Sequence, residues 1–299
     1  MFEIAPAQGA RSYEPGSHIN VVVIVGGEQQ TRSYSLIGDP GADVYRIAVK
    51  RLPDGRGGSA YMWSLKLNAR LTIARPRNRF ELSTGDGEYL LMAGGIGITP
   101  IYGMALSLWK RRANFRLVYA ARSHADMAFA EQLKDRLGDR LELCPEDRGG
   151  RIDLGNQIGR LSKSGELYVC GPVGMLEAVK RCWRDQERPP GGLRFETFGT
   201  AGHHPSESFV VAVRNLGREF VVPRNRSLLE AIEAEGIPMI SNCRRGECGV
   251  CAVTIVDADH GIDHRDVFLS DEQKAANQKM CTCVSRAVGG RLVIETGDR

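Results

Sequence analysis

The most informative stretch of the chain is Cys243-Arg-Arg-Gly-Glu-Cys248-Gly-Val-Cys251, three cysteines separated by four and then two residues. Five of the eight cysteines in the chain fall between positions 243 and 283. This spacing is typical of a [2Fe–2S] cluster, whose iron is held by soft thiolates. Gly246 and Gly249 allow the backbone to wrap closely and to point N–H groups at the sulfides. The loop therefore predicts an iron–sulfur domain in the last third of the chain.

The identity of the fourth ligand is open between Cys281 and Cys283. The context Thr282-Cys283-Val284-Ser285-Arg286 resembles that of the fourth ligand in ferredoxins and related reductases, and it favours Cys283. The predicted ligands are therefore Cys243, Cys248, Cys251 and Cys283. A structural zinc site is the alternative, but such sites usually combine two short Cys pairs, or a Cys pair with a His pair.

Length and charge limit the other possibilities. The 299 residues suggest two domains, or three small ones. A net charge of +4, from 40 basic and 36 acidic residues, is too even to indicate nucleic acid or an anionic membrane as partner. No apolar run approaches the roughly 20 residues of a membrane span, and the N-terminus has no signal-peptide pattern. We expect a cytoplasmic protein with reduced cysteines.

The pattern of predicted strands and helices changes twice along the chain. Residues 1–87 predict short strands at 20–25, 32–36, 45–49 and 71–74, a spacing that suggests a small antiparallel barrel. In residues 88–200 strands alternate with helices, which favours a parallel α/β domain. Residues 201–207 are a candidate linker. Residues 208–299 predict a small α+β domain, with a helix over 227–235 capped by Ser227 and Glu230.

Two motifs in the α/β segment are suited to a dinucleotide. Gly94-Gly95-Ile96-Gly97-Ile98-Thr99-Pro100 lies between a buried strand and a helix expected from residue 101 to about 111. Its glycines permit close approach of a ligand, and a helix N-terminus favours a pyrophosphate. Cys170-Gly171-Pro172 also ends a strand, where open α/β sheets bind ligands. Neither has the ordinary Rossmann spacing, so a tight turn and a packed cysteine are the plain alternatives.

Two further motifs are suited to a flavin. Arg32-Ser33-Tyr34-Ser35 offers a cation for a phosphate and an aromatic ring for the isoalloxazine. Arg56-Gly57-Gly58-Ser59 precedes a probable helix and could form an anion site. Each motif alone is also compatible with an ordinary strand or surface turn.

Taken together and in this order, the motifs resemble the phthalate dioxygenase reductase family, which includes vanillate O-demethylase reductases. The resemblance covers almost the whole chain, including Glu196 to Gly199. It implies a multidomain fold: an antiparallel flavin-binding β-barrel over 1–87, an NAD-binding α/β domain like that of ferredoxin–NADP⁺ reductase over 88–200, and a β-grasp plant-type ferredoxin domain over 208–299. The chain begins later than family members do, so we expect either a barrel that is short at its N-terminal edge or a start that lies inside a longer sequence.

The resemblance also implies FMN, NADH and one [2Fe–2S] cluster as cofactors. The residues that it assigns to FMN are Arg32, Tyr34, Ser35, Ala48, Val49, Lys50, Arg56, Gly57, Gly58 and Ser59. Those that it assigns to NADH are Gly95, Ile96, Gly97, Ile98, Arg122, Cys170, Gly171 and Pro172. Thr99 and Phe198 would lie at the flavin ring, and Thr99, Cys170 and Phe198 form the implied catalytic set for hydride transfer. FAD and NADPH remain open as alternatives, since Arg122 could meet a 2′-phosphate.

The implied function is a reductase that passes electrons from NADH through FMN and the cluster to a Rieske-type terminal oxygenase, for aromatic-ring hydroxylation or O-demethylation. Flavin belongs between the other two because NADH delivers a hydride whereas the cluster accepts one electron at a time. A monomer without nucleic-acid or membrane partners is expected. The alternatives are a reductase for a cytochrome P450 or another acceptor, and an electron-relay subunit that does not oxidise NADH. The charged region 257–266 is expected to be a surface loop rather than a second metal site.

Overall fold

The computed structural model describes residues 1–299 except 39–40, 42, 54, 199–203 and 298–299. The chain divides into two compact units. Unit 1 comprises Met1–Leu52 and Gly58–Glu196, and unit 2 comprises Pro53–Gly57 and Thr197–Arg299. Part of the candidate linker, residues 201–203, and Gly199 of the Glu196–Gly199 motif lie outside the described residues.

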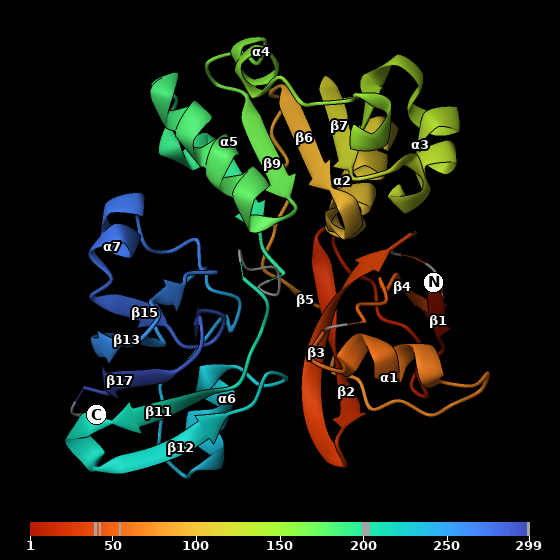
Figure 1. Cartoon of the computed structure of the whole chain (residues 1–299). Coiled ribbons are helices and arrows are strands. Elements are labelled where there is room, and N and C mark those ends of the chain that lie inside the picture. Colours follow the sequence, from red (N-terminus) through yellow and green to blue (C-terminus); the bar gives the residue numbers. More distant parts are fainter. Residues whose placement is uncertain (39–40, 42, 54, 199–203, 298–299) are drawn as a thin grey trace. The chain divides into compact units, whose positions relative to one another are not determined.

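Unit 1 begins with an antiparallel sheet in the strand order β1-β4-β3-β2-β5 (Figure 1). Its strands are β1 (Phe2–Ile4), β2 (Ser17–Val25), β3 (Glu28–Ile37), β4 (Tyr45–Ile47) and β5 (Arg77–Asn78). Ile19, Val21 and Val23 alternate along β2 and are fully buried, because successive side chains of a strand point to opposite faces. They form one core with Met62 of helix α1 (Gly58–Ser64).

The strand expected at 71–74 is wrong. The structure has an isolated bridge between Val21 and Ile73, supported by a hydrogen bond from the Ala74 N–H to the Asn20 carbonyl at 2.8 Å. Pro76 follows at once and has no N–H with which to extend the pairing. Among the described strands no pairing joins β1 to β5, so the sheet is open where a closed barrel was expected. These outer strands contain three and two residues, which leaves little backbone for closure.

The second sheet of unit 1 is parallel throughout, in the order β10-β9-β6-β7-β8. Its strands are β6 (Tyr89–Gly94), β7 (Phe115–Ala121), β8 (Leu141–Pro145), β9 (Glu166–Cys170) and β10 (Leu193–Glu196). The flanking helices are α2 (Ile98–Lys110), α3 (Ala130–Leu137), α4 (Leu154–Gly159) and α5 (Val173–Asp185) (Figure 1). Every residue of β6 is buried, as in a central parallel strand covered on both faces. This confirms the expected α/β architecture, with α2 beginning at Ile98 rather than at 101.

The strand order reverses beside β6. The chain first adds β7 and β8 on one side of β6, and then returns to add β9 and β10 on the other. The loops that follow β6 and β9 therefore diverge from a topological switch point, where open α/β sheets bind their ligands.

Unit 2 is a mixed sheet with one main helix (Figure 1). Its strand order is β12-β11-β17-β13-β15, and the pairing of β11 with β17 is parallel. The strands are β11 (Phe209–Val213), β12 (Arg218–Val222), β13 (Ala252–Ala258), β15 (Lys279–Cys281) and β17 (Arg291–Glu295). Helix α6 (Leu228–Ala234) buries Leu228 and Ile232 in the core of this sheet. It begins with the predicted capping box of Ser227 and Glu230.

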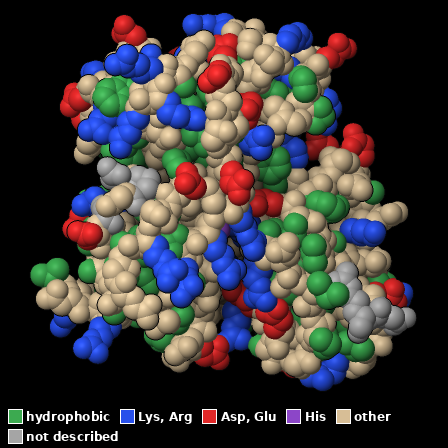
Figure 2. Space-filling model, turned by 180° about the vertical axis from the view of Figure 1, so that it is seen from behind, with side chains coloured by type: hydrophobic (Ala, Val, Ile, Leu, Met, Phe, Trp, Pro, Cys, Tyr) green, Lys and Arg blue, Asp and Glu red, His purple; other side chains and the backbone are tan. Residues whose placement is uncertain are grey.

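Unit 2 also contains shorter elements. Strands β14 (Ile262–Asp263) and β16 (Arg286–Ala287) pair with each other, and helix α7 (Asp271–Ala276) follows a capping serine, Ser270. In the part of the chain that the structure describes, no helix is both long and apolar enough to cross a membrane. Basic and acidic side chains are interspersed over the face shown in Figure 2, as the nearly even charge count leads one to expect.

Candidate functional site

The two dinucleotide motifs lie directly against each other. A Cβ atom at Gly97 would lie 2.2 Å from the carbonyl oxygen of Cys170. A Cβ at Gly171 would lie 3.1 Å from the Cα of Gly94. Both contacts are made with backbone, which cannot swing aside as a side chain can, so the turns meet only because both carry glycine. The motifs that the sequence places far apart thus come together at the switch point between β6 and β9.

The N-terminus of α2 continues from this contact. A single 3-10 turn, Gly95–Gly97, leads into the helix, and Gly95 has a φ of +53°. The first turn of α2 contains no acidic residue. Thr99 is buried, and its hydroxyl donates to the Ile96 carbonyl at 3.0 Å, which holds the turn. The N–H groups of a helix start and the positive end of the helix dipole suit this position to a pyrophosphate.

The end of β7 carries further polar groups. Arg122 is exposed, and its carbonyl accepts a hydrogen bond from the Asp147 N–H at 3.1 Å. Ser123 donates to the carboxylate of Asp126 at 3.0 Å, and Lys50 pairs with the other oxygen at 3.0 Å. These hydrogen bonds, first that from Lys50, hold the pKa of Asp126 below its ordinary value. Asp126 is an acidic group at this edge that the sequence analysis missed, because it lies beyond the residues directly after the strand.

The two flavin motifs also meet. A Cβ at Gly58 would lie 2.8 Å from the Cγ and Nε atoms of Arg32, so the arginine side chain packs over the first residue of α1. The next residue, Ser59, accepts a hydrogen bond from the Leu52 N–H at 3.1 Å. A guanidinium beside a glycine at a helix start is suited to a phosphate. Tyr34 follows on the same face of β3, and its burial raises its pKa to about 12 although Arg32 lowers it.

Other residues assigned to the flavin lie nearby in unit 1. Ser35 on β3 is buried, and Ala48, Val49 and Lys50 follow β4 in irregular structure. The Val49 carbonyl accepts a hydrogen bond from Trp63 Nε1 at 3.0 Å. Arg56 and Gly57 belong to the short segment grouped with unit 2, where Arg56 pairs with Glu230 at 3.3 Å.

The segment that carries Phe198 is anchored to the cysteine loop. Phe198 is half-buried, and the preceding Thr197 is buried. The Thr197 N–H donates to the carboxylate of Glu247 at 2.9 Å, and its hydroxyl donates to the Arg245 carbonyl at 2.7 Å. Thr197 was assigned no role from the sequence, because it occupies the unspecified position of the Glu196–Gly199 motif.

The cysteine loop has the geometry of a sulfur site. The N–H groups of Arg245 and Glu247 each donate to the Sγ of Cys243 at 3.4 Å. Gly246 and Gly249 adopt φ values of +78° and +70°, in the left-handed region that favours glycine. Backbone N–H groups of the loop therefore point at the Cys243 sulfur in the folded protein itself.

Thiols from the loop and from the segment after β15 gather together. The pKa of Cys243 lies below its ordinary value chiefly because Cys283 donates a hydrogen bond to it. The pKa of Cys251 is also lowered, by hydrogen bonds from Cys281 and then Cys283. Cys283 thus reaches thiols from both ends of the loop, whereas Cys281 adjoins Cys251.

The donor set suits a two-iron cluster. Among the described residues no three His, Cys, Asp or Glu side chains are grouped as they would be around a single metal ion. A [2Fe–2S] cluster divides four thiolate ligands between two irons, so its ligands need not converge on one point. Four thiols with backbone donors aimed at one sulfur fit that chemistry.

The charged region 257–266 is not the surface loop that the sequence suggested. Asp257 and Asp259 are exposed as expected, but Asp263, Arg265 and Asp266 are buried. The Nε of Arg265 donates to Asp263 at 2.8 Å, and pairing of this kind offsets the cost of burying both charges. A run of charged residues in the sequence does not reveal which of them pair with one another in the fold. The burial of this region could therefore not be predicted.

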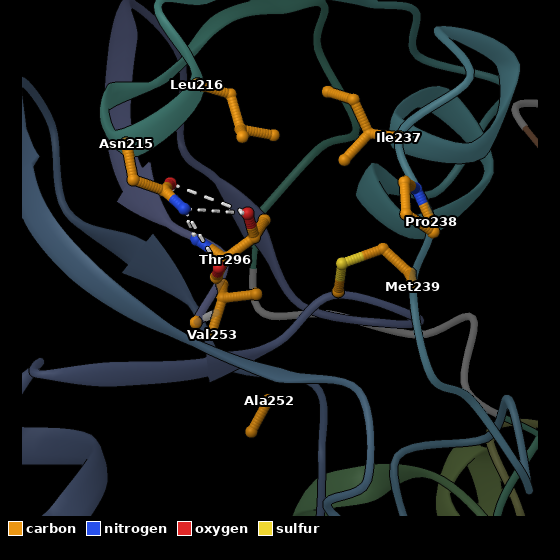
Figure 3. A pocket seen from close by; sticks show the side chains of 9 residues that line it. Asn215, Leu216, Ile237, Pro238, Met239, Ala252, Val253 and Thr296 are labelled. Atoms are coloured by element: carbon orange, nitrogen blue, oxygen red, sulfur yellow. Dashed lines mark hydrogen bonds between the residues drawn. The ribbon is translucent and has the colours of Figure 1, made fainter. Parts of the chain in front are cut away.

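Unit 2 also contains a pocket of about 430 Å³ (Figure 3). Asn215 and Thr296 close one side of it through a hydrogen bond of 3.0 Å from the Asn215 amide to the Thr296 carbonyl. The rest of the lining is mainly apolar, with Ile237, Pro238 and Met239 opposite. No residue predicted to bind a cofactor lines this pocket, so it has no place in the sites described above.

Comparison with known proteins identifies both functional segments. Residues 211–288 match the 2Fe-2S iron-sulfur cluster binding domain, and residues 91–181 match the oxidoreductase NAD-binding domain. Both matches confirm the predictions for these segments.

Similarity to known proteins extends over nearly the whole chain. It is 35% identical to a putative toluene-4-sulfonate monooxygenase system reductase subunit of Comamonas testosteroni, covering 97% of this chain and 90% of that protein. It is 36% identical to a vanillate O-demethylase oxidoreductase of a Pseudomonas species, covering 94% and 90%. The solved structure of phthalate dioxygenase reductase, described as a modular structure for electron transfer from pyridine nucleotides to [2Fe-2S], aligns with a TM-score of 0.76 at 30% identity, covering 99% and 92%.

Gly97→Ala tests the dinucleotide turn. The new methyl group would press on the Cys170 carbonyl, and the turn would have to shift. We expect kcat/KM for NADH, with ferricyanide as acceptor, to fall at least about tenfold, because small displacements of a positioned reactant are costly. Gly174→Ala is the matched control, since no heavy atom lies within 4 Å of its Cβ position. Equal activity of the two variants would contradict the assignment.

The fourth ligand is tested by two serine variants. Cys283→Ser is expected to lose most of the visible cluster absorption, because a hydroxyl is a poorer ligand than a thiolate for this iron. Cys281→Ser is expected to keep it. The reverse pattern, read from absorption spectra and iron content of the purified full chain, would transfer the ligand role to Cys281.

Proposed function

The chain belongs to the family of oxygenase-system reductases that includes phthalate dioxygenase reductase, and we propose a specific electron route for it. The chain takes a hydride from NADH and passes electrons one at a time, by way of FMN and the [2Fe–2S] cluster, to a Rieske-type terminal oxygenase. The organic substrate would bind the oxygenase and not this chain.

One observation carries the proposal: a single chain holds a glycine turn suited to a dinucleotide and four thiols suited to a two-iron cluster, three in the cysteine loop and one after β15. NADH gives up two electrons as a hydride, whereas the cluster takes electrons singly. Bound flavin supplies the chemistry that connects the two, since it can exchange either one or two electrons.

In this proposal the chain's own residues bind NADH and orient it. The N–H groups at the start of α2 hold the pyrophosphate of NADH, and the Gly97–Cys170 contact sets the distance from that site to β9. Hydride transfer needs a separation of about 3–3.5 Å between the reacting atoms and no general acid or base. Thr99, Cys170 and Phe198 are therefore proposed to shape the reacting face and not to move protons.

The open antiparallel sheet of unit 1 is proposed to be the flavin-binding module. Arg32 packed over Gly58 supports a terminal phosphate at the start of α1, which favours FMN over FAD. Asp126 and Ser123 at the end of β7 support NADH, because the ribose hydroxyls of NADH need hydrogen-bond acceptors at this edge.

A Rieske-type oxygenase is proposed as the acceptor, and the support for an oxygenase is that relatives spanning nearly the full chain are named as monooxygenase reductase subunits. Reconstitution with candidate acceptors decides this point. A purified Rieske oxygenase should turn over its substrate with NADH and this chain, whereas turnover of a cytochrome P450 in its place would select the other acceptor.

Cys248→Ser tests the order of the route. This variant should reduce ferricyanide with NADH about as fast as the native chain, while its reduction of cytochrome c, which draws single electrons from the cluster, should fall at least about tenfold. Cys182→Ser, a half-buried thiol on α5 outside the loop, is the control and should alter neither rate. Equal loss of both activities in Cys248→Ser would contradict the proposed order, and a native chain that does not oxidise NADH would favour the relay alternative.

A further inference from the structure

Asp266 is a fully buried carboxylate in the cluster domain. Its Oδ1 accepts a hydrogen bond from the Ser285 hydroxyl at 2.9 Å, and its Oδ2 accepts one from the Leu269 N–H at 2.9 Å. The Nδ1 of His264 lies 3.7 Å from Oδ1. Burial raises the pKa of Asp266, but contacts with His264, Leu269 and Ser285 bring it below the ordinary value. The side chain is thus an ionised group whose burial is offset by surrounding donors.

The backbone of Asp266 supports the cysteine loop. A Cβ at Gly246 would lie 2.9 Å from the Cα of Asp266 and 2.6 Å from a methyl carbon of Val284. The N–H of the next residue, Val267, donates to the Gly246 carbonyl at 2.9 Å. Gly246 lies midway between Cys243 and Cys248, so the loop rests on Asp266 at its centre.

The carboxylate of Asp266 holds the other ligand segment. Ser285 lies two residues after Cys283, and its N–H donates to the Cys281 carbonyl at 3.0 Å. The Ser285 hydroxyl also accepts a hydrogen bond from the Arg265 N–H at 3.1 Å. One residue therefore links the loop that carries three predicted ligands to the segment that carries the fourth.

We propose that Asp266 is a positioning residue for the cluster: it joins the two ligand-bearing segments, and its negative charge makes the cluster harder to reduce. The first effect follows because outer contacts that fix ligands commonly change metal affinity by about 10–100-fold. The second follows because an added electron is repelled by a nearby buried anion. The proposal rests on the cluster-domain assignment and does not depend on NADH, flavin or the acceptor.

Asp266→Asn in the full chain tests both effects. The amide keeps the size of the side chain but loses its charge. Its NH₂ group also replaces one carboxylate oxygen, so a hydrogen-bond donor of the protein loses its acceptor. We expect cluster absorption to decay roughly tenfold faster in EDTA and the cluster midpoint potential, titrated with dithionite, to shift upward. Asp271→Asn is the matched control, because Asp271 is an exposed residue in the first turn of α7 and should change neither quantity.

Ser285→Ala separates the two effects and serves if Asp266→Asn does not fold. It removes the hydrogen bond to Oδ1 and keeps the charge, so we expect faster cluster loss without the upward shift seen for Asp266→Asn. A potential of Asp266→Asn equal to that of Asp271→Asn would overturn the electrostatic part, whatever the stability. If Ser285→Ala and Asp266→Asn both keep the cluster as long as the control does, the positioning part is overturned. Dithionite and EDTA act without NADH, so failure here is distinct from failure of the proposed route.

Discussion

Both functional sites depend on backbone segments that approach each other more closely than any side chain permits. At the end of β6 the backbone at Gly97 meets the carbonyl of Cys170, and in the cysteine loop the backbone at Gly246 meets Asp266. Contacts of this kind are rigid, because neither partner can rotate away as a side chain can. They fix the loops before a ligand arrives, which lowers the cost of ordering them upon binding. Hydride transfer from NADH and ligation of the cluster both need such fixed geometry.

Buried charge distinguishes the surroundings of the cysteine loop from those of the glycine turn before α2. The turn at α2 offers uncharged N–H groups and has no acid in its first helical turn. The cysteine loop instead rests on a segment with Asp263, Arg265 and Asp266 in the interior. Uncharged donors suit an anionic ligand that must bind and leave, whereas a permanent charged network suits a group that stays and whose potential must be set.

The sequence predicted those parts of the molecule that local spacing determines. The Cys-x4-Cys-x2-Cys loop, the glycine turn after β6 and the capping box at Ser227 were all found from the sequence, since each depends on residues a few positions apart. The strand expected at 71–74 was wrong, and the described pairings do not show the expected barrel, because pairing depends on the partner strand and on where Pro76 stops it. Thr197 and Asp266 were missed for the same reason: their partners lie elsewhere in the chain, at Arg245 and Ser285.

An anaerobic visible-absorption titration of the purified chain with NADH tests whether one chain connects a hydride donor to a one-electron cluster. We expect the flavin and iron–sulfur bands both to bleach as NADH is added. A flavin band that stays oxidised, or a cluster band that stays oxidised after the flavin is reduced, would contradict the proposed route.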